Sequence, residues 1–391
     1  MNPNIPEELI TDILWRLPIN KPSCVARFRC VCKSWCALLS NPSFILREDP
    51  LDSDLQILIN FDNENDEPVY SLLSADTLDP LLPSPVSLPF NAENPLEHGG
   101  RIITIAGSCN GLICISRDRD GLILWNPATA ETKLVPPSPS RPQCLWSLDA
   151  VGFGFDSETN DYKVIRQVKD EKGSCKCGYI SEVYSLRNDS WTRLADDDDD
   201  DDGNGYCPCL PCMQIPQWNK GKLYWWGWDK DAKSLSFDSF DISSQEFEKV
   251  DLPIPDSEVP HNHVHEIPDY LLMMEESMVA LFPLAASPRA GEIWVLCKYW
   301  IAESWTKCST LNPLPGTIVG TFVGISRNLK WLFTSLWSSD ASDDVSLSLT
   351  AIEPRTGKFY DLDISGHIEE LPVTVNYTPS QVCMRDYFMS S

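Results

Sequence analysis

Hydrophobic and polar residues follow two different patterns along this chain, and the change falls near residue 50. In residues 5–45, apolar residues recur at intervals of three and four, which predicts short amphipathic helices. Pro6 suits the first turn of the first helix, and Pro18 ends it because the residue before a proline is disfavoured in helical backbone. The apolar positions of this first helix are Leu9, Ile10, Ile13, Leu14 and Leu17.

Two further short segments continue the helical pattern. The second segment carries Val25 and Phe28. The third has its apolar positions at Val31, Cys32, Trp35, Leu38 and Leu39. Three short helices in fewer than fifty residues bury too little apolar surface to fold alone. We therefore expect them either to pack on the rest of the chain or to present an apolar face to another protein.

From residue 55 onward, short alternating runs bounded by Gly, Pro, Asn, Asp and Ser predict strands and hairpins. A weak repeat relates the hairpins, and its landmarks lie 55 to 59 residues apart. Such a period suits four-stranded propeller blades and is close to that of kelch repeats. The landmarks are Tyr70, Trp125, Tyr184, Phe240, Val295 and Ile352.

The predicted fold is therefore mainly β: a short N-terminal three-helix domain at 1–47, followed by a β-propeller-like domain at 48–391 in which six blades are favoured. A single β-sandwich is the alternative, but the β region is too long for one.

The sequences IPEELITDILWRLP at 5–18 and VARFRCVCKSWCALLSNPSFI at 25–45 resemble an F-box, the motif that docks on the Skp-type adaptor of SCF ubiquitin ligases. Eight residues separate Pro18 from Arg27, more than is usual in that family, so the turn between the helices is longer. The resemblance implies binding to a Skp-type adaptor and, through it, to a cullin. The implied adaptor-binding residues are Pro6, Leu9, Ile10, Ile13, Leu14, Leu17, Pro18, Phe28, Val31, Cys32, Trp35 and Leu38.

A second resemblance covers the β region. The segments are GSCNGLICI (107–115), LWNPATAETKLVPPSP (124–139), GFGFDSETNDYKV (152–164), VYSLRNDSWTRL (183–194) and GKLYWW (221–226). In this order they are similar to the F-box-associated domain of plant F-box proteins. That family includes immune-receptor regulators and S-locus proteins that recognise basic ribonucleases. The resemblance implies a domain that recruits protein substrates for ubiquitylation, and the residues that bind the substrate are unknown.

The net charge of −26 indicates which partners the protein can bind and says nothing about its fold. An acidic body repels nucleic acid and anionic membranes and associates faster with basic proteins, so the expected substrate is a protein, with a basic one favoured. No apolar run is long enough to cross a membrane, and no secretory signal is recognised. With 15 cysteines read as free thiols, we expect a reducing location, in the cytoplasm, the nucleus or both.

Several clusters of polar residues could form metal-binding or partner-binding sites, but each cluster also has a simpler interpretation. Cys175-x-Cys177, Cys207-x-Cys209-x-x-Cys212 and His261-x-His263-x-His265 resemble zinc ligands, but only Cys209 and Cys212 have the usual spacing. We interpret these clusters as residues of inter-strand loops. The run Asp196–Asp202, in a predicted acidic loop around 195–206, suits a solvated loop or a contact for a basic partner better than a calcium site.

The sequence contains little evidence of a catalytic site. None of the five histidines lies in a recognisable nucleophile motif, and no phosphate-binding glycine motif occurs. We therefore predict a non-catalytic adaptor with no catalytic residue, metal or cofactor. Trp225, Trp226 and Trp228 are interpreted as blade core rather than as a sugar-binding cage. The alternative functions are a β-propeller scaffold or a glycan-binding protein that acts without ubiquitin.

Overall fold

The computed structural model describes most of the β region. The described residues are 55–62, 68–82, 84–88, 103–117, 121–140, 150–169, 179–194, 215–229, 234–250, 270–273, 278–283, 291–296, 305–311, 318–339, 345–366, 373–380 and 382–384, with Val31, Trp35 and Tyr387 as single residues. All 23 strands in these ranges pair antiparallel, so the described part is mainly β, as the alternating pattern predicts. No helix in this part is long and apolar enough to cross a membrane.

The strands form six sheets, which we name A to F. Sheet A contains β1 (Gln56–Asp62), β2 (Pro68–Ser74) and β23 (Val373–Tyr377). Sheet B contains β3 (Ile103–Cys109), β4 (Leu112–Arg117), β5 (Gly121–Asn126) and β6 (Glu131–Leu134). Sheet C contains β7 (Ala150–Asp156), β8 (Asp161–Lys169), β9 (Tyr179–Ser185) and β10 (Ser190–Arg193).

The remaining sheets have the same four-stranded order. Sheet D contains β11 (Gln217–Asn219), β12 (Lys222–Asp229), β13 (Ser234–Asp241) and β14 (Glu246–Lys249). Sheet E contains β15 (Tyr270–Met273), β16 (Met278–Pro283), β17 (Gly291–Leu296) and β18 (Trp305–Leu311). Sheet F contains β19 (Ile318–Ile325), β20 (Leu332–Ser339), β21 (Val345–Glu353) and β22 (Lys358–Gly366).

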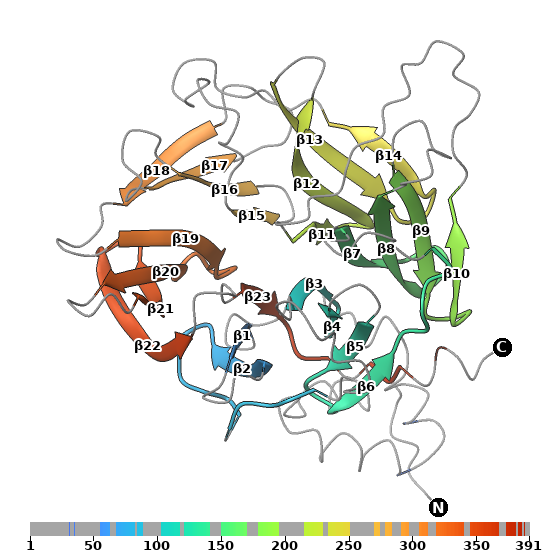
Figure 1. Ribbon diagram of the computed structural model, residues 1–391, viewed down its shortest axis with the longest axis horizontal. Coiled ribbons are helices and arrows are strands. Elements are labelled where there is room, and N and C mark those ends of the chain that lie inside the picture. The colour runs from blue at the N-terminus through green and yellow to red at the C-terminus, as the bar shows by residue number, and fades with distance from the viewer. Residues whose placement is uncertain are drawn as a thin grey trace, which may run out of the picture.

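One strand of each sheet lines the centre of a ring (Figure 1). Along this ring β3 contacts β7, which is followed by β11, β15, β19 and β23, and β23 contacts β3 again. Sheets arranged in this way around a central axis form a β-propeller. The six described sheets equal the number of blades that the repeat predicts.

The landmarks of the repeat occupy equivalent positions in the six sheets. Each lies on the third strand from the centre, namely on β2, β5, β9, β13, β17 and β21. The side chains of Tyr70, Trp125, Tyr184, Phe240 and Ile352 are all buried. The predicted period therefore corresponds to a repeat in the structure. The residues that define it lie in the outer half of each blade, on the third strand from the centre.

The ring closes by pairing the two ends of the β region. β23 follows all the other strands in sequence, yet it pairs antiparallel with β1, so that Gln56 lies opposite Tyr377 and Asn60 opposite Val373. Sheet A thus combines one late strand with two early ones. Because a ladder of main-chain hydrogen bonds joins distant parts of the chain, this sheet holds the first and last sheets of the ring together.

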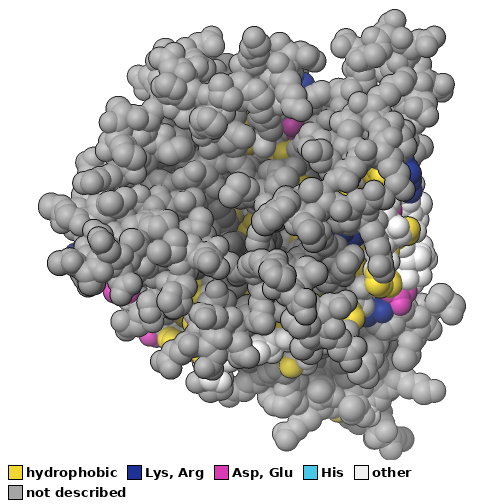
Figure 2. All heavy atoms as spheres, viewed as in Figure 1, with side chains coloured by type: hydrophobic (Ala, Val, Ile, Leu, Met, Phe, Trp, Pro, Cys, Tyr) yellow, Lys and Arg dark blue, Asp and Glu magenta, His cyan; other side chains and the backbone are white. Residues whose placement is uncertain are grey.

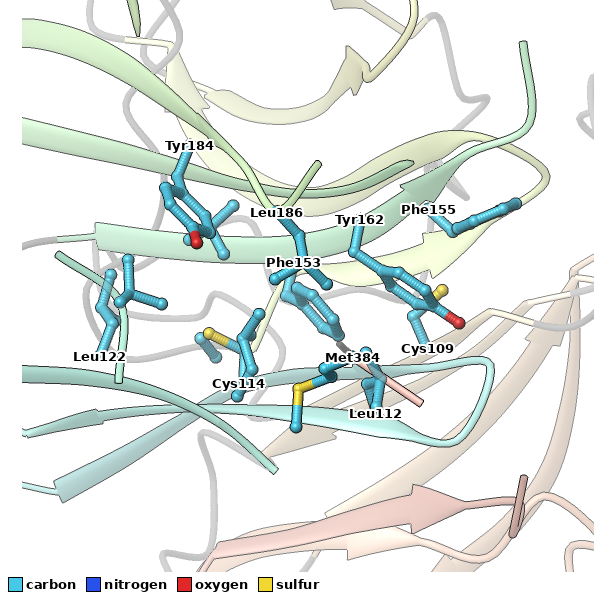
Figure 3. Close-up of a cluster of buried hydrophobic side chains, with 14 of the residues drawn as sticks. Cys109, Leu112, Cys114, Leu122, Phe153, Phe155, Tyr162, Tyr184, Leu186 and Met384 are labelled. Carbon is cyan, nitrogen blue, oxygen red and sulfur yellow. The ribbon is translucent and has the colours of Figure 1, made fainter. Parts of the chain in front are cut away.

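Apolar side chains fill the spaces between neighbouring sheets. Between sheets B and C, Cys114, Phe153, Tyr162 and Tyr184 belong to one buried cluster, which Met384 from the C-terminal segment completes (Figure 3). Separate clusters join sheets A and B, A and F, and C and D. In sheet C burial decreases outward: β7 is buried along its whole length, whereas the outermost strand β10 is mostly exposed. The inner strand of this sheet is therefore covered on both faces.

Candidate interaction faces

The order of strands within each sheet defines two faces of the ring. Numbering the strands of a sheet from the centre outward, the turns between strands one and two and between strands three and four lie at the same end of an antiparallel sheet. We call this side the turn face. The connections between strands two and three, and from each sheet to the next, belong to the opposite side, which we call the loop face.

Tight turns build the turn face. Asn110-Gly111 and Lys220-Gly221 form two-residue hairpin turns in which both residues have positive φ, a conformation that suits the right-handed twist of the strands they join. The four-residue hairpins whose turns the structure describes each end in a residue of positive φ, at Ala130, Asn160, Asp189, Gln245 and Gly357. These turns were not predicted individually from the sequence.

Hydrogen bonds between neighbouring sheets link the turns around this face. Lys133 of sheet B forms an ion pair with Asp189 of sheet C at 2.8 Å. Between sheets F and A, the side-chain amide of Asn328 donates to the carbonyl of Ala75 at 3.2 Å. These contacts show that the turns of adjacent sheets lie at the same level, which confirms the division into two faces.

A buried ionic network joins sheets C and D at the turn face. The Lys163 ammonium lies 2.6 Å from the Asp156 carboxylate and 3.2 Å from the carbonyl oxygen of Ile242 in sheet D. The hydroxyl of Ser243, also in sheet D, donates to Asp156 at 2.6 Å. Burial alone would raise the pKa of Asp156, but the hydrogen bonds from Lys163, Ser243 and Thr159 hold this pKa well below its usual value.

The C-terminal segment crosses the turn face of sheet B. The Asn126 side chain donates to the carbonyl oxygens of Ser380 and Val382, at 3.2 and 2.8 Å, and accepts from the amide of Ala128. Beyond these contacts, Tyr387 packs edge-on against Tyr162 of sheet C, with ring centroids 5.3 Å apart. The segment therefore ties sheet A to sheets B and C.

The loop-face connections are strongly acidic. Leaving aside the connection from β2 to β3, which runs from the turn face to the loop face, they contain 26 Asp and Glu against 7 Lys and Arg, whereas the turn-face connections contain 5 against 6. The cysteine and histidine clusters and the run Asp196–Asp202 all belong to loop-face connections, and these residues lie outside the described part of the chain. In Figure 2 most of the visible surface belongs to residues that are not described, and described side chains gather along the edge near β9 and β10.

Two buried carboxylates lie on the strands that lead to the loop face. Glu182 on β9 accepts hydrogen bonds from the hydroxyls of Ser138 and Ser140, which fasten the connection after β6 to sheet C. Asp238 on β13 is 2% exposed, and burial raises its pKa to about 7, although the nearby Lys249 acts to lower it. The Asp238 carboxylate accepts a hydrogen bond from the hydroxyl of Ser236 on the same strand at 3.1 Å.

The family is now identified by sequence comparison. A family model described as the F-box associated beta propeller domain matches residues 69–384, most of the chain. The chain belongs to this family. The match extends beyond both ends of the sequence motifs at 107–226 that resemble the F-box-associated domain. It runs from β2 to the C-terminal segment that crosses sheet B.

Relatives of this F-box associated propeller protein occur in Arabidopsis thaliana. F-box protein CPR1 is 32% identical over 322 residues, covering 79% of this chain and 73% of the relative. F-box protein At3g08750 is 28% identical over 260 residues, covering 63% of this chain and 60% of the relative. The chain spans 62% of the length of a further relative, the putative F-box protein At3g16210. Among solved structures, TolB from Acinetobacter baumannii aligns with 85% of this chain and 69% of its own at 8% identity, with a TM-score of 0.47, which is too low to transfer any property.

The predicted adaptor-binding residues fall almost entirely outside the described residues of this F-box protein. Only Val31 and Trp35 are described: Val31 is 58% exposed, and Trp35 is half-buried. The remaining residues of that set, from Pro6 to Leu38, stay predictions. The domain boundary at residue 47 also stays a prediction.

The other predicted features can be placed in part. Trp225 and Trp226 are fully buried within sheet D, which confirms their interpretation as blade core, and the Trp228 side chain lies outside the described set. Within the described residues, no group of three His, Cys, Asp or Glu could hold a metal ion. The network of Lys163 and Asp156 was missed; the only sequence signal was a lysine between the apolar residues Tyr162 and Val164 of β8.

Proposed function

We propose that this protein is the substrate-recognition subunit of an SCF-type ubiquitin ligase. The F-box pattern in residues 5–45 would dock on a Skp-type adaptor, and the propeller would hold a target protein. The observation that carries the proposal is the junction of that helical pattern to a propeller of the F-box associated family. The chain would act by proximity, raising the effective concentration of a target lysine near the ubiquitin-charged enzyme without chemistry of its own.

The two faces favour opposite roles. β1 pairs antiparallel with the innermost strand β23, so it starts at the turn face, and the residues before Leu55 join the propeller there. The adaptor-binding end would therefore lie on the turn-face side, leaving the loop face for the target. The acidic composition of the loop-face connections favours a basic target, which would be steered by long-range attraction. The expected location of the complex is the cytoplasm or the nucleus.

Binding of the full chain to a purified Skp-type adaptor tests the proposal. Leu14→Asp or Trp35→Asp should weaken the measured affinity by about 100-fold or more, because each change loses an apolar anchor of about 1.5–3 kcal/mol and adds a charge to the docking face. Lys220→Glu, on the turn of sheet D, is the matched control and should bind as the wild type does. Unchanged affinity in both F-box variants would overturn the docking role.

The target can be sought by affinity capture from plant cells with and without proteasome inhibition. A true substrate should be captured by the wild-type chain, should accumulate when the proteasome is inhibited, and should also accumulate when wild-type protein is replaced by Leu14→Asp. A captured protein whose level responds to neither treatment would contradict a role in degradation and favour a scaffold that acts without ubiquitin.

A further inference from the structure

A short proline-rich segment begins the loop-face connection between β6 and β7. It comprises residues 136–140, with the sequence PPSPS, and we call it the strap. Pro137 and Pro139 are exposed, whereas Ser138 between them is 4% exposed. The serine therefore faces the propeller, and the two prolines that flank it face solvent.

The strap covers a buried carboxylate on β9. Glu182 is 1% exposed and lies on the face of β9 that carries Tyr184 and Leu186 into the space between sheets B and C. Its carboxylate accepts hydrogen bonds from the hydroxyl of Ser138 and, at 2.5 Å, from that of Ser140. In the part of the chain that the structure describes, Glu182 forms no ion pair. Because a buried charge without donors is costly, the two hydroxyls stabilise this carboxylate.

Two arginines flank Glu182 within sheet C. Arg166 lies opposite it on β8, and Arg193 lies opposite it on β10. Arg166 is 3% exposed, whereas Arg193 is exposed. These cations offset part of the repulsion that a further negative charge would meet, but they create no space. The Ser138 hydroxyl already lies at hydrogen-bond distance from the carboxylate, so a phosphate on this serine has no room in the closed strap.

Few hydrogen bonds hold the strap in place. Its three prolines have no amide hydrogen and cannot donate to a strand ladder. The amide of Ser140 donates to the Ser138 hydroxyl at 3.2 Å, within the strap itself. Besides the two hydroxyls, the indole of Trp191 on β10 fixes the strap by donating to the carbonyl of Pro136 at 2.7 Å. A segment held by side-chain hydrogen bonds, without a ladder, opens locally at a lower cost than the sheets.

The sequence around Ser138 is typical of a kinase substrate. Pro139 follows it directly, and Arg141 lies three residues after it in the sequence. Proline-directed kinases select a serine by the proline that follows it, and a basic residue at this distance strengthens recognition. Backbone before a proline is also held extended, which suits binding in a kinase groove. The serine that closes the strap is therefore the one that this pattern marks.

We propose that Ser138 is a phosphorylation site and that its modification keeps the strap released from sheet C. A proline-directed kinase would transfer the γ-phosphoryl group of ATP to the serine oxygen of the open strap. The bond from phosphorus to the oxygen of ADP breaks, a bond to the serine oxygen forms, and the hydroxyl proton is released. The phosphate then prevents closure by its size and by repulsion from Glu182.

Release of the strap would alter the face that the proposed function gives to the target. This consequence rests on the proposed function, since the strap begins a loop-face connection, whereas the F-box joins the propeller at the turn face. Phosphorylation would therefore change the affinity for a target and leave the affinity for the adaptor unchanged.

Treatment of the purified full chain with a proline-directed kinase and ATP tests the proposal. Mass spectrometry should locate phosphate on Ser138. Trp191→Phe removes the indole donor to the strap and should raise the initial rate of this phosphorylation about 5-fold, because the open strap becomes more populated. Trp218→Phe is the matched control: its indole donates to the carbonyl of Phe155 at 3.3 Å, so the rate should stay unchanged. Absence of phosphate from Ser138, or equal rates in both variants, would overturn the proposal.

The melting temperature separates release of the strap from accommodation of the phosphate. Phosphorylated wild type should melt about 2 °C or more below the unmodified chain, because Glu182 loses its two donors. In Glu182→Gln, which buries no charge, the shift should be less than about half as large. Kinase-treated Ser138→Ala keeps every other potential site and should show no shift. An unchanged or raised melting temperature of the phosphorylated wild type would overturn release.

These measurements need neither an adaptor nor a target, so they can fail independently of the proposed function. Failure of Leu14→Asp to weaken adaptor binding would contradict the proposed function and leave the result for Ser138 intact.

Discussion

Lys163 and Asp156 form a buried ion pair within sheet C, and both side chains also bind residues of the neighbouring sheet D. Their side chains are 9% and 0% exposed, so water cannot solvate either charge when the other is removed. Lys163→Met should therefore lower the free energy of unfolding by about 3–5 kcal/mol, because it leaves Asp156 buried and ionised. Urea unfolding at pH 7 measures this loss. Lys133→Met, which breaks the more exposed pair with Asp189, should cost at most about 1 kcal/mol.

The pH dependence of this pair has a definite sign. Burial acts to raise the pKa of Asp156, but its hydrogen bonds hold the folded-state pKa below the ordinary value of 3.8. The folded state then binds fewer protons than the unfolded state, so the stabilisation is complete above about pH 5 and is lost as the pH falls below about 4. The difference in unfolding free energy between wild type and Lys163→Met should narrow as the pH falls from about 5 to about 2. A constant difference would show that lost packing, not charge, causes the defect.

Gly324 on the innermost strand β19 permits close contact between sheets F and A. A Cβ at this position would lie 1.7 Å from the Thr374 hydroxyl oxygen on β23, which donates to the carbonyl of Val323. Gly324→Ala should lower the melting temperature, with a loss of about 1–3 kcal/mol from overpacking. In a Thr374→Ala background the same change should cost less, because the clashing hydroxyl is absent. Equal costs in both backgrounds would rule out the clash as the cause.

At the scale of elements, the C-terminal segment behaves as part of the propeller. Asn126 is fully buried and its amide holds two carbonyls of this segment. Asn126→Ala should cost about 1–3 kcal/mol, because it leaves buried carbonyl groups without a donor. Hydrogen exchange in residues 379–384 should rise locally before global unfolding. Asn188→Ala, in an exposed turn of sheet C, is the control and should leave exchange in that segment unchanged.

The elements also show what sequence patterns can predict. Tyr70, Trp125 and Tyr184 could be aligned because each anchors the third strand of its blade in the same way, so the period and the fold class followed from local spacing. The pairing of β1 with β23 could not be predicted, because it depends on closure of the whole ring rather than on any local pattern. For the same reason, the partners of Lys163 and Asn126 emerge only after the sheets are placed side by side.

At the scale of the whole molecule, sequence and structure contribute different parts of the candidate site. The adaptor-binding residues of the F-box are predicted only from their pattern, and of these the structure describes just Val31 and Trp35. The order of the described strands in turn places each connection except that from β2 to β3 at one of two faces, which the sequence alone could not do. Acidic residues that are scattered along the sequence, such as Asp196–Asp202 and Asp343, are then seen to belong to connections of the same face.

This distribution of charge predicts how a target binds. Replacing Asp196–Asp202 by seven asparagines should slow association with a basic target by about 10-fold at low ionic strength, because steering depends on the summed field of one face. Stopped-flow or surface plasmon resonance measurements from 20 to 500 mM NaCl should show a shallower salt dependence in the variant, with little change in the dissociation rate. Glu275→Gln/Glu276→Gln, in a turn-face connection, is the control and should leave association unchanged. If the asparagine variant kept the wild-type association rate at every salt concentration, the acidic run would have no part in target binding, and the target would be held elsewhere on the propeller.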